Sequence, residues 1–122
     1  MFAAHYHLDN LCIIVDLNGL QIDGPTSVVM NTAPVDEKFE AFGCDVVEIE
    51  GNDFDELEHG FKKFHKNIGK GKPTVILMHT TKGKGVSYME NQVGWHGKAP
   101  NDAEYAQGMA ELAEARKQIE EA

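Results

Sequence analysis

The sequence predicts an α/β fold, a three-layer arrangement built on a mostly parallel sheet. Three short runs rich in apolar residues, at positions 10–16, 45–50 and 73–81, have the composition of strands. Apolar residues recur at helical spacing in the segments between and after these runs. Strands that alternate with helices form parallel sheets with right-handed crossovers, and 122 residues suffice for one core. We therefore treat residues 1–122 as a single domain.

The first expected element is the end of a helix at residues 1–8 (MFAAHYHL). No capping residue precedes it, so we expect the chain to begin inside a secondary-structure element. The run at 10–16 (NLCIIVD) is almost continuously apolar, which is typical of a strand buried on both faces of a parallel sheet. The sequences NG at 18–19 and DGP at 23–25 indicate turns in the loop that follows.

The next segment predicts a helix and a second strand. Val35, Phe39 and Phe42 have helical spacing, and Gly43 has the position of a C-terminal stop. Residues 45–50 (DVVEIE) form the second expected strand. This order fits a connection between two parallel strands.

A longer helix is expected after the second strand. Asp53 is a suitable N-cap, with Glu56 three residues later as its capping-box partner, and Gly69 is expected to end the helix. The apolar face of this helix comprises Phe54, Leu57, Phe61, Phe64 and Ile68.

The third strand is expected at 73–81 (PTVILMHTT), with proline at its first position, where the missing N–H is tolerated. A long loop at 82–100 follows, and loops of this length in a compact domain are usually functional. Asn101 is expected to cap a final amphipathic helix. Its apolar face comprises Tyr105, Met109, Leu112 and Ile119.

The composition excludes several classes of function. There are 11 basic and 20 acidic residues, so the net charge of −9 argues against binding nucleic acid or an anionic membrane. The longest apolar run near the start, at 11–15, is far too short to span a bilayer. Cys12 and Cys44 both lie in apolar runs, which favours buried, reduced thiols and a cytoplasmic protein.

In parallel α/β sheets ligands bind beyond the carboxyl ends of the strands, which selects residues 18–24 and 82–98. In the first segment, the Asn18 amide and the Leu20 carbonyl could both face one magnesium ion, which prefers oxygen ligands. The alternative is that Asn18-Gly19 forms only a turn, because both residues tolerate a positive φ.

The second segment carries basic and aromatic residues among glycines. Lys82-Gly83-Lys84-Gly85 could present backbone amides and ammonium groups to phosphate, although it lacks the pattern of a Walker loop; the alternative is a flexible, solvated basic loop. Further on, His96 is suited to proton transfer or anion binding near neutral pH. Trp95, the only tryptophan, is expected to pack the loop against the domain.

The remaining histidines are given structural interpretations. The spacing of His5 and His7 does not favour a metal site, and His59 and His65 lie off the apolar face of their helix. His79 is expected to be packed at the end of its strand.

Four stretches of this chain resemble transketolases: AAHYHLDNLCIIVDLNGLQIDG, FEAFGCDVVEIEGNDFDEL, GKPTVILMHTTKGKGVSYMEN and GWHGKAPNDAEY. They run in the family's order from about Ala3 to Tyr105, and they are most similar to transketolases that are split into separate N-terminal and C-terminal subunits. The resemblance implies the thiamine diphosphate-binding fold. It also implies transfer of a two-carbon ketol unit from a ketose phosphate to an aldose phosphate.

The resemblance assigns a metal site. Family members bind Mg through the Asp of a GDG motif, a downstream Asn, and the backbone carbonyl two residues after that Asn. Asn18 matches this Asn and Leu20 matches the carbonyl donor. Leu17 stands where many relatives have Asn or Asp, which is a mild departure.

The resemblance also assigns residues that contact thiamine diphosphate and the sugar. Ile22 matches a residue that packs near the cofactor rings, and Lys82 matches a lysine that contacts the cofactor in some transketolases. His96 matches the histidine that reaches both the diphosphate and the bound sugar, and is the one catalytic residue expected here. Lys98 matches a substrate-binding lysine beside that histidine.

No GDG motif occurs in the sequence, and by family order it would fall just upstream of Met1. The pyrimidine-binding domain and the glutamate that activates the cofactor are also absent. We therefore expect a partial domain, truncated at its N-terminus, that is inactive alone and works with a second chain. The alternatives are a non-catalytic remnant of the fold, or a subunit of a deoxyxylulose-phosphate synthase or dehydrogenase relative. The loop SYMENQVGWHGKAP favours transketolase.

Self-association, as a dimer, is expected as well. The run LCIIV at 11–15 carries no charge and would lie near an open sheet edge, where unpaired backbone groups tend to pair with another chain. The competing expectation is a monomer in which the C-terminal helix folds over the exposed sheet face.

Overall fold

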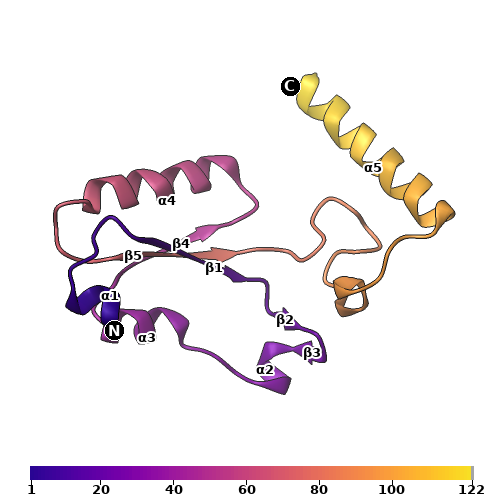
Figure 1. The fold of residues 1–122 in the computed structure, drawn as a ribbon. Helices are drawn as coiled ribbons and strands as arrows, with labels where there is room; N and C mark the ends of the chain where they lie inside the picture. The colour runs from indigo at the N-terminus through magenta and orange to yellow at the C-terminus, as the bar shows by residue number, and fades with distance from the viewer. Residues whose placement is uncertain (122) are drawn as a thin grey trace.

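The computed structural model describes residues 1–121. Its main sheet has three parallel strands in the order β1 (Cys12–Leu17), β5 (Thr74–His79) and β4 (Asp45–Glu50) (Figure 1). Cys12 and Asp45 both lie opposite Thr74, so the three strands begin and end in register. All three carboxyl ends therefore meet at one edge of the sheet. The predicted α/β class and parallel sheet are confirmed.

Helices cover both faces of the sheet, which gives the three predicted layers (Figure 1). On one face, α3 (Val35–Ala41) closes a core of alternate strand residues. This core comprises Cys44, Val75 and Leu77, with Ile13, Val15, Leu17, Val35, Phe39 and Val46 packed around them. The other face is covered by α4 (Phe54–Asn67), which packs against β4 and β5. Because Gly60 has no side chain, α4 can approach Ile49 and Ile76 closely.

The prediction that residues 10–16 form a strand buried on both faces is wrong. Ile14 is 48% exposed and Asp16 is exposed, although the neighbouring strand β5 is fully buried from Thr74 to Leu77. The reason is position: β1 is an edge strand among the described residues, and α4 packs over β4 and β5 instead. The apolar run is nevertheless strand, because Ile13, Val15 and Leu17 contribute to the core on the α3 face.

The ends of α4 follow the sequence signals in part. The Asp53 carboxylate accepts hydrogen bonds from the amides of Asp55 and Glu56, so the predicted cap forms. The expected reciprocal bond from Glu56 does not, because the Asp53 amide donates to the Glu50 carbonyl. Gly69 follows the helix with φ +90°, as expected of a stop residue.

Several short elements were not predicted. The segment at 18–25, expected as a loop, contains the small hairpin of β2 (Leu20–Gln21) and β3 (Gly24–Pro25). The N-terminal helix is shorter than residues 1–8. The remaining short helices are α1 (Phe2–His5), α2 (Thr26–Val29) and the 3₁₀ helix η1 (Val93–His96).

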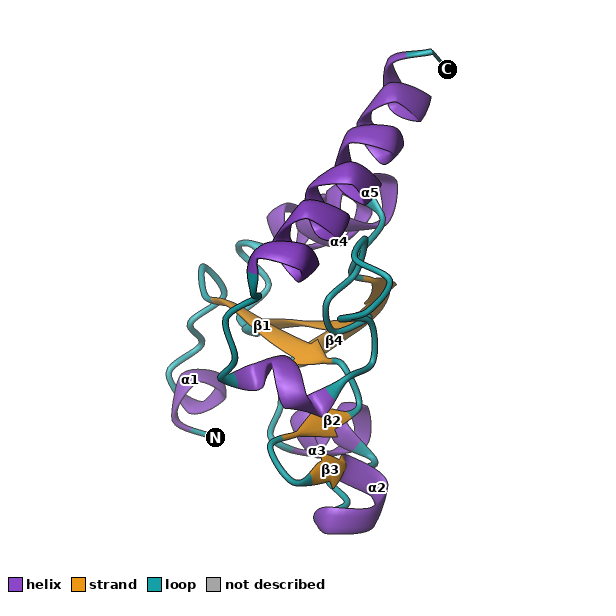
Figure 2. Ribbon diagram, turned by 90° about the vertical axis from the view of Figure 1, so that its right-hand side faces the viewer, coloured by secondary structure: helices purple, strands orange, loops and turns teal. Residues whose placement is uncertain are grey.

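The last helix, α5 (Asp102–Glu120), begins at the predicted cap and extends away from the sheet (Figures 1 and 2). The Asn101 side chain accepts from the Glu104 amide, and the Glu104 side chain accepts from the Asn101 amide. Its apolar stripe does not cover the sheet: Tyr105, Met109, Leu112 and Ile119 are all exposed. Within residues 1–121, no helix has the length and apolar character needed to cross a membrane.

Candidate functional site

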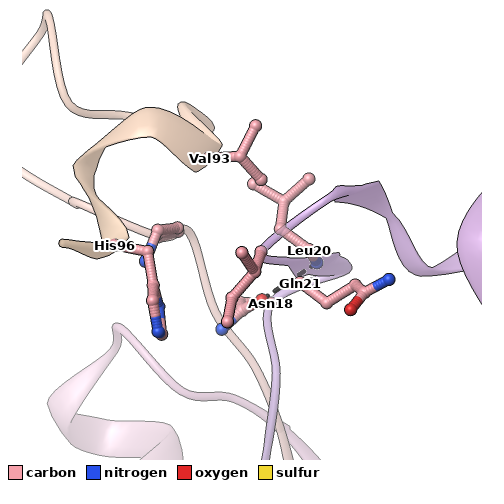
Figure 3. Close-up of a pocket in the computed structure, with 7 residues that line it drawn as sticks. Asn18, Leu20, Gln21, Val93 and His96 are labelled. Atoms are coloured by element: carbon pink, nitrogen blue, oxygen red, sulfur yellow. Dashed lines mark hydrogen bonds between the residues drawn. The ribbon is translucent and has the colours of Figure 1, made fainter.

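A cavity of about 270 Å³ lies beyond the carboxyl ends of β1 and β5, at the edge of the sheet where ligands were expected. It is lined by Asn18, Leu20, Gln21, Ile22, Lys82, Val93 and His96. The structure thus brings together five of the residues singled out from the sequence, namely Asn18, Leu20, Ile22, Lys82 and His96. Figure 3 shows Asn18, Leu20 and Gln21 from the chain after β1, facing His96 and Val93 of η1.

The segment after β1 forms a turn that still leaves oxygen atoms available. The Asn18 side-chain oxygen accepts a hydrogen bond of 2.9 Å from the Leu20 amide, and Gly19 has φ +72° (Figure 3). This bond uses one of the two lone pairs of the amide oxygen. Pro25, which lies opposite Leu20 in the β2–β3 pair, has no N–H to donate to the Leu20 carbonyl. The turn interpretation and the metal-ligand interpretation are therefore compatible.

The donor set fits magnesium only in part. An amide oxygen and a backbone carbonyl are suitable hard ligands, and Mg²⁺ commonly takes further ligands from water and phosphate. Within residues 1–121, no group of three or more His, Cys, Asp or Glu side chains is arranged to hold a metal ion. The cavity therefore offers two neutral oxygen donors without a carboxylate cluster.

The loop at 82–85 is neither flexible nor open to phosphate in this conformation. It closes on itself, because the Lys82 carbonyl accepts from the Asn91 amide at 2.9 Å. The Gly85 amide donates to the Glu90 carboxylate at 3.0 Å, so an acidic side chain of the protein already occupies the position proposed for an anion. Of this loop, only Lys82 lines the cavity.

Trp95 packs the second part of the loop, as predicted. Its indole N–H donates to the Tyr88 carbonyl at 2.9 Å, and the two rings lie 5.1 Å apart. The neighbouring His96 side chain is exposed and faces the cavity from η1.

Lys98 is the one predicted site residue that does not line the cavity. Its ammonium lies 2.6 Å from the Glu104 carboxylate and 4.1 Å from the centre of the Trp95 ring. The hydrogen bond from Lys98, together with that from the Asn101 amide, holds the pKa of Glu104 below its ordinary value.

Two cavity residues, Gln21 and Val93, were not anticipated. Gln21 belongs to the unpredicted strand β2, between Leu20 and Ile22. Val93 precedes His96 by three residues, and residues at this spacing lie on the same side of a 3₁₀ helix. No sequence signal distinguished a 3₁₀ turn from irregular loop here.

Other polar predictions have mixed outcomes. His79 is exposed, with Nε2 2.6 Å from the Glu48 carboxylate, so the expectation of a packed histidine is wrong. Cys12 and Cys44 are both free, and Cys44 is buried. Burial raises the pKa of the Cys12 thiol above its ordinary value. His59 and His65 are exposed, as expected.

The fold and the cavity define a ligand-binding α/β domain, with its site at the carboxyl ends of parallel strands. A family model described as "Transketolase, thiamine diphosphate binding domain" matches residues 1–118. The chain therefore belongs to the transketolase family and comprises part of its thiamine diphosphate-binding domain.

Curated relatives agree with this assignment. The chain is 38% identical over 120 residues to one subunit of the apulose-4-phosphate transketolase of Phocaeicola vulgatus, and the match covers 98% of this chain and 42% of the relative. It is 43% identical over 110 residues to the subunit of the same name from Actinobacillus succinogenes, covering 90% and 39%. The chain thus spans about two fifths of the length of these relatives.

Solved structures confirm the fold. The transketolase of Campylobacter jejuni is similar with a TM-score of 0.83 and 28% identity, over 92% of this chain and 17% of that protein. A transketolase of Pichia stipitis, in complex with sedoheptulose-7-phosphate, gives 0.78 and 28% over 88% and 16%.

Proposed function

We propose that this chain supplies one part of a magnesium–thiamine diphosphate site in a multi-chain transketolase. The enzyme would transfer a two-carbon ketol unit between sugar phosphates. The observation that carries the proposal is the single cavity lined by Asn18, Leu20, Ile22, Lys82 and His96. These residues come from three separate segments, yet each is one that the family resemblance assigns to the cofactor or the metal.

Each cavity residue has a role that its chemistry supports. The Asn18 amide oxygen and the Leu20 carbonyl would hold magnesium, and the Lys82 ammonium would neutralise the diphosphate. Ile22 offers an exposed apolar side chain to the cofactor rings. His96 can donate a hydrogen bond to a phosphate or sugar oxygen and can exchange a proton near neutral pH. When bound, the cofactor supplies the carbanion chemistry, whereas these residues bind and orient.

The remaining groups would come from other segments or chains. The sequence contains no GDG motif, and the cavity offers only neutral oxygen donors to a metal. We propose that a second polypeptide segment supplies the metal-binding carboxylate, and that a pyrimidine-binding domain supplies the activating glutamate. Relatives whose names describe them as single subunits of a transketolase support a multi-chain enzyme. Two free cysteines favour a cytoplasmic location.

A segment replacement tests the proposal. Residues 1–122 would replace the matching segment of the Actinobacillus succinogenes relative. The hybrid would then be combined with the second chain of that transketolase and assayed with a ketose phosphate donor and an aldose phosphate acceptor. We expect thiamine diphosphate-dependent turnover. His96→Ala should lower kcat/KM by about 100-fold or more, as for loss of a proton-transferring residue.

A matched histidine variant provides the control. His59 is exposed on α4, on a helix that contributes nothing to the cavity, so His59→Ala should leave kcat/KM within about twofold, as for surface substitutions in general. A folded, assembled hybrid without turnover would contradict the proposal and favour a non-catalytic remnant. Equal effects of the two histidine variants would also contradict it.

A further inference from the structure

Lys98 lies beside the proposed active-site histidine in sequence but points away from the cavity. We propose that Lys98 is a positioning residue, which ties η1 to the first turn of α5 and so fixes His96, and that it does not contact substrate. The proposal deepens the proposed function and rests on it, since it concerns the placement of the histidine that function requires.

Both partners of the Lys98 side chain lie outside the cavity. Its ammonium bonds the Glu104 carboxylate at 2.6 Å and lies 4.1 Å from the centre of the Trp95 ring. A cation over an aromatic face is attracted to it, and the charge-assisted bond to Glu104 is stronger than a neutral one. Because Trp95 directly precedes His96, these contacts act on the residue that carries the imidazole into the cavity.

Glu104 is a rigid anchor for this tie. One carboxylate oxygen accepts from Lys98, whereas the other accepts from the Asn101 amide at 2.8 Å. The Asn101 side chain in turn accepts from the Glu104 amide at 2.9 Å. The anchor is therefore the capping box that begins α5, and its side chain is held from two sides.

A second set of contacts joins the same two elements. The Tyr88 hydroxyl donates to the Glu104 carbonyl at 2.6 Å, and the Tyr88 carbonyl accepts from the Trp95 indole. Gly108 allows this approach, because a Cβ at that position would lie 2.9 Å from the Tyr88 hydroxyl. Tyr88, Trp95 and Lys98 thus form one cluster against the first turns of α5.

The His96 imidazole depends on this cluster. Among residues 1–121 no hydrogen bond holds the imidazole itself, and a Cβ at either Gly94 or Gly97 would meet nothing within 4 Å. The geometry of η1 therefore rests on its neighbours Trp95 and Lys98. Displacement of a reacting group by about 1 Å can lower a rate by about 100-fold, so a surface ion pair here can matter for catalysis.

The 122-residue chain itself offers a direct test. Trp95 is the only tryptophan, so its fluorescence reports on the cluster, and NMR resonances of the His96 ring report on the cavity. We expect Lys98→Met to shift both signals, Lys98→Arg to restore them, and Glu104→Gln to reproduce the Lys98→Met change. Lys84→Met is the control, because Lys84 is an exposed lysine of the same loop, 3.9 Å from Glu90.

The reconstituted enzyme gives a second readout. A positioning role predicts that Lys98→Met lowers kcat about tenfold to 100-fold, with the KM for sugar phosphate little changed. A rise in KM with unchanged kcat would instead show substrate binding and overturn the proposal. His96 resonances that respond to Lys98→Met no more than to Lys84→Met would overturn it as well. Since the NMR test needs no turnover, failure of the proposed function and failure of this inference are distinguishable.

Discussion

Replacement of Gly83 by alanine tests whether the closed loop beside the cavity is built as the structure shows. Gly83 has φ +74°, a left-handed conformation that residues with a side chain rarely adopt. A Cβ at this position would also lie 2.6 Å from the carbonyl oxygen of Met89 and 2.7 Å from its carbonyl carbon. Because these are backbone atoms, a side-chain rotation cannot relieve the clash.

The magnitude follows from these two effects. The left-handed conformation costs about 1–2 kcal/mol for a non-glycine residue. Overpacking against a fixed neighbour adds about 1–3 kcal/mol. Gly83→Ala should therefore destabilise the closed loop by about 2–5 kcal/mol. Gly69→Ala is a matched control, since Gly69 has φ +90° but a Cβ there would meet no atom within 4 Å, so only the conformational effect remains.

Amide hydrogen exchange measures the loop directly, because the Asn91 amide closes it by donating to the Lys82 carbonyl. A loss of about 2–5 kcal/mol corresponds to an increase in the exchange rate of about 30-fold to several thousand-fold, unless local opening already dominates. Gly69→Ala should leave exchange at Asn91 unchanged. Unaltered exchange at Asn91 in Gly83→Ala would refute the close approach of Gly83 to Met89.

Three further predictions concern pH, cofactor and assembly. Hydrogen bonds from Lys98 to Glu104 and from Ser87 to Glu111 hold the pKa of both carboxyls below their ordinary value. Docking of the loop on α5 should therefore be fully present above that ordinary value and be lost as pH falls through the lowered pKa; Trp95 fluorescence against pH checks this, and a flat profile would contradict it. The isolated chain should bind thiamine diphosphate weakly, even with magnesium, and show no transketolase turnover, because only neutral oxygen donors face the metal; tight, magnesium-dependent binding in calorimetry or turnover above a buffer blank would overturn this. Finally, the chain should self-associate, since β1 is an open edge with Ile14 48% exposed; a monomer mass by light scattering at every concentration would rule it out.

The sequence was sufficient for the elements whose signals are local. Helical spacing and caps located α4 and α5, because a capping side chain such as Asn101 needs only the amides of its own first turn. The strand at 45–50 was correct to the residue. In contrast, the burial of 10–16 depends on which strands lie beside it, and one strand's own composition does not contain that information.

The same distinction applies to the site. Asn18 and His96 could be placed near one another because strand order in a parallel sheet gathers the segments that follow the strands. The direction of a side chain within a loop could not be predicted. Lys98 and Glu90 show why: each forms a hydrogen bond with a group that is close only after the loop has folded.

The open edge of β1 and the incomplete metal site are related features. Asn18 directly follows β1, and a second cavity of about 560 Å³ adjoins the first, since Asn18 and Leu20 line both. A strand paired in parallel with the free edge of β1 would bring its carboxyl end beside Asn18. Acidic groups at that end would meet the two neutral oxygen donors. The surface on which we expect chains to associate therefore leads to the position where the proposed metal site needs charge, so assembly and cofactor binding should be coupled.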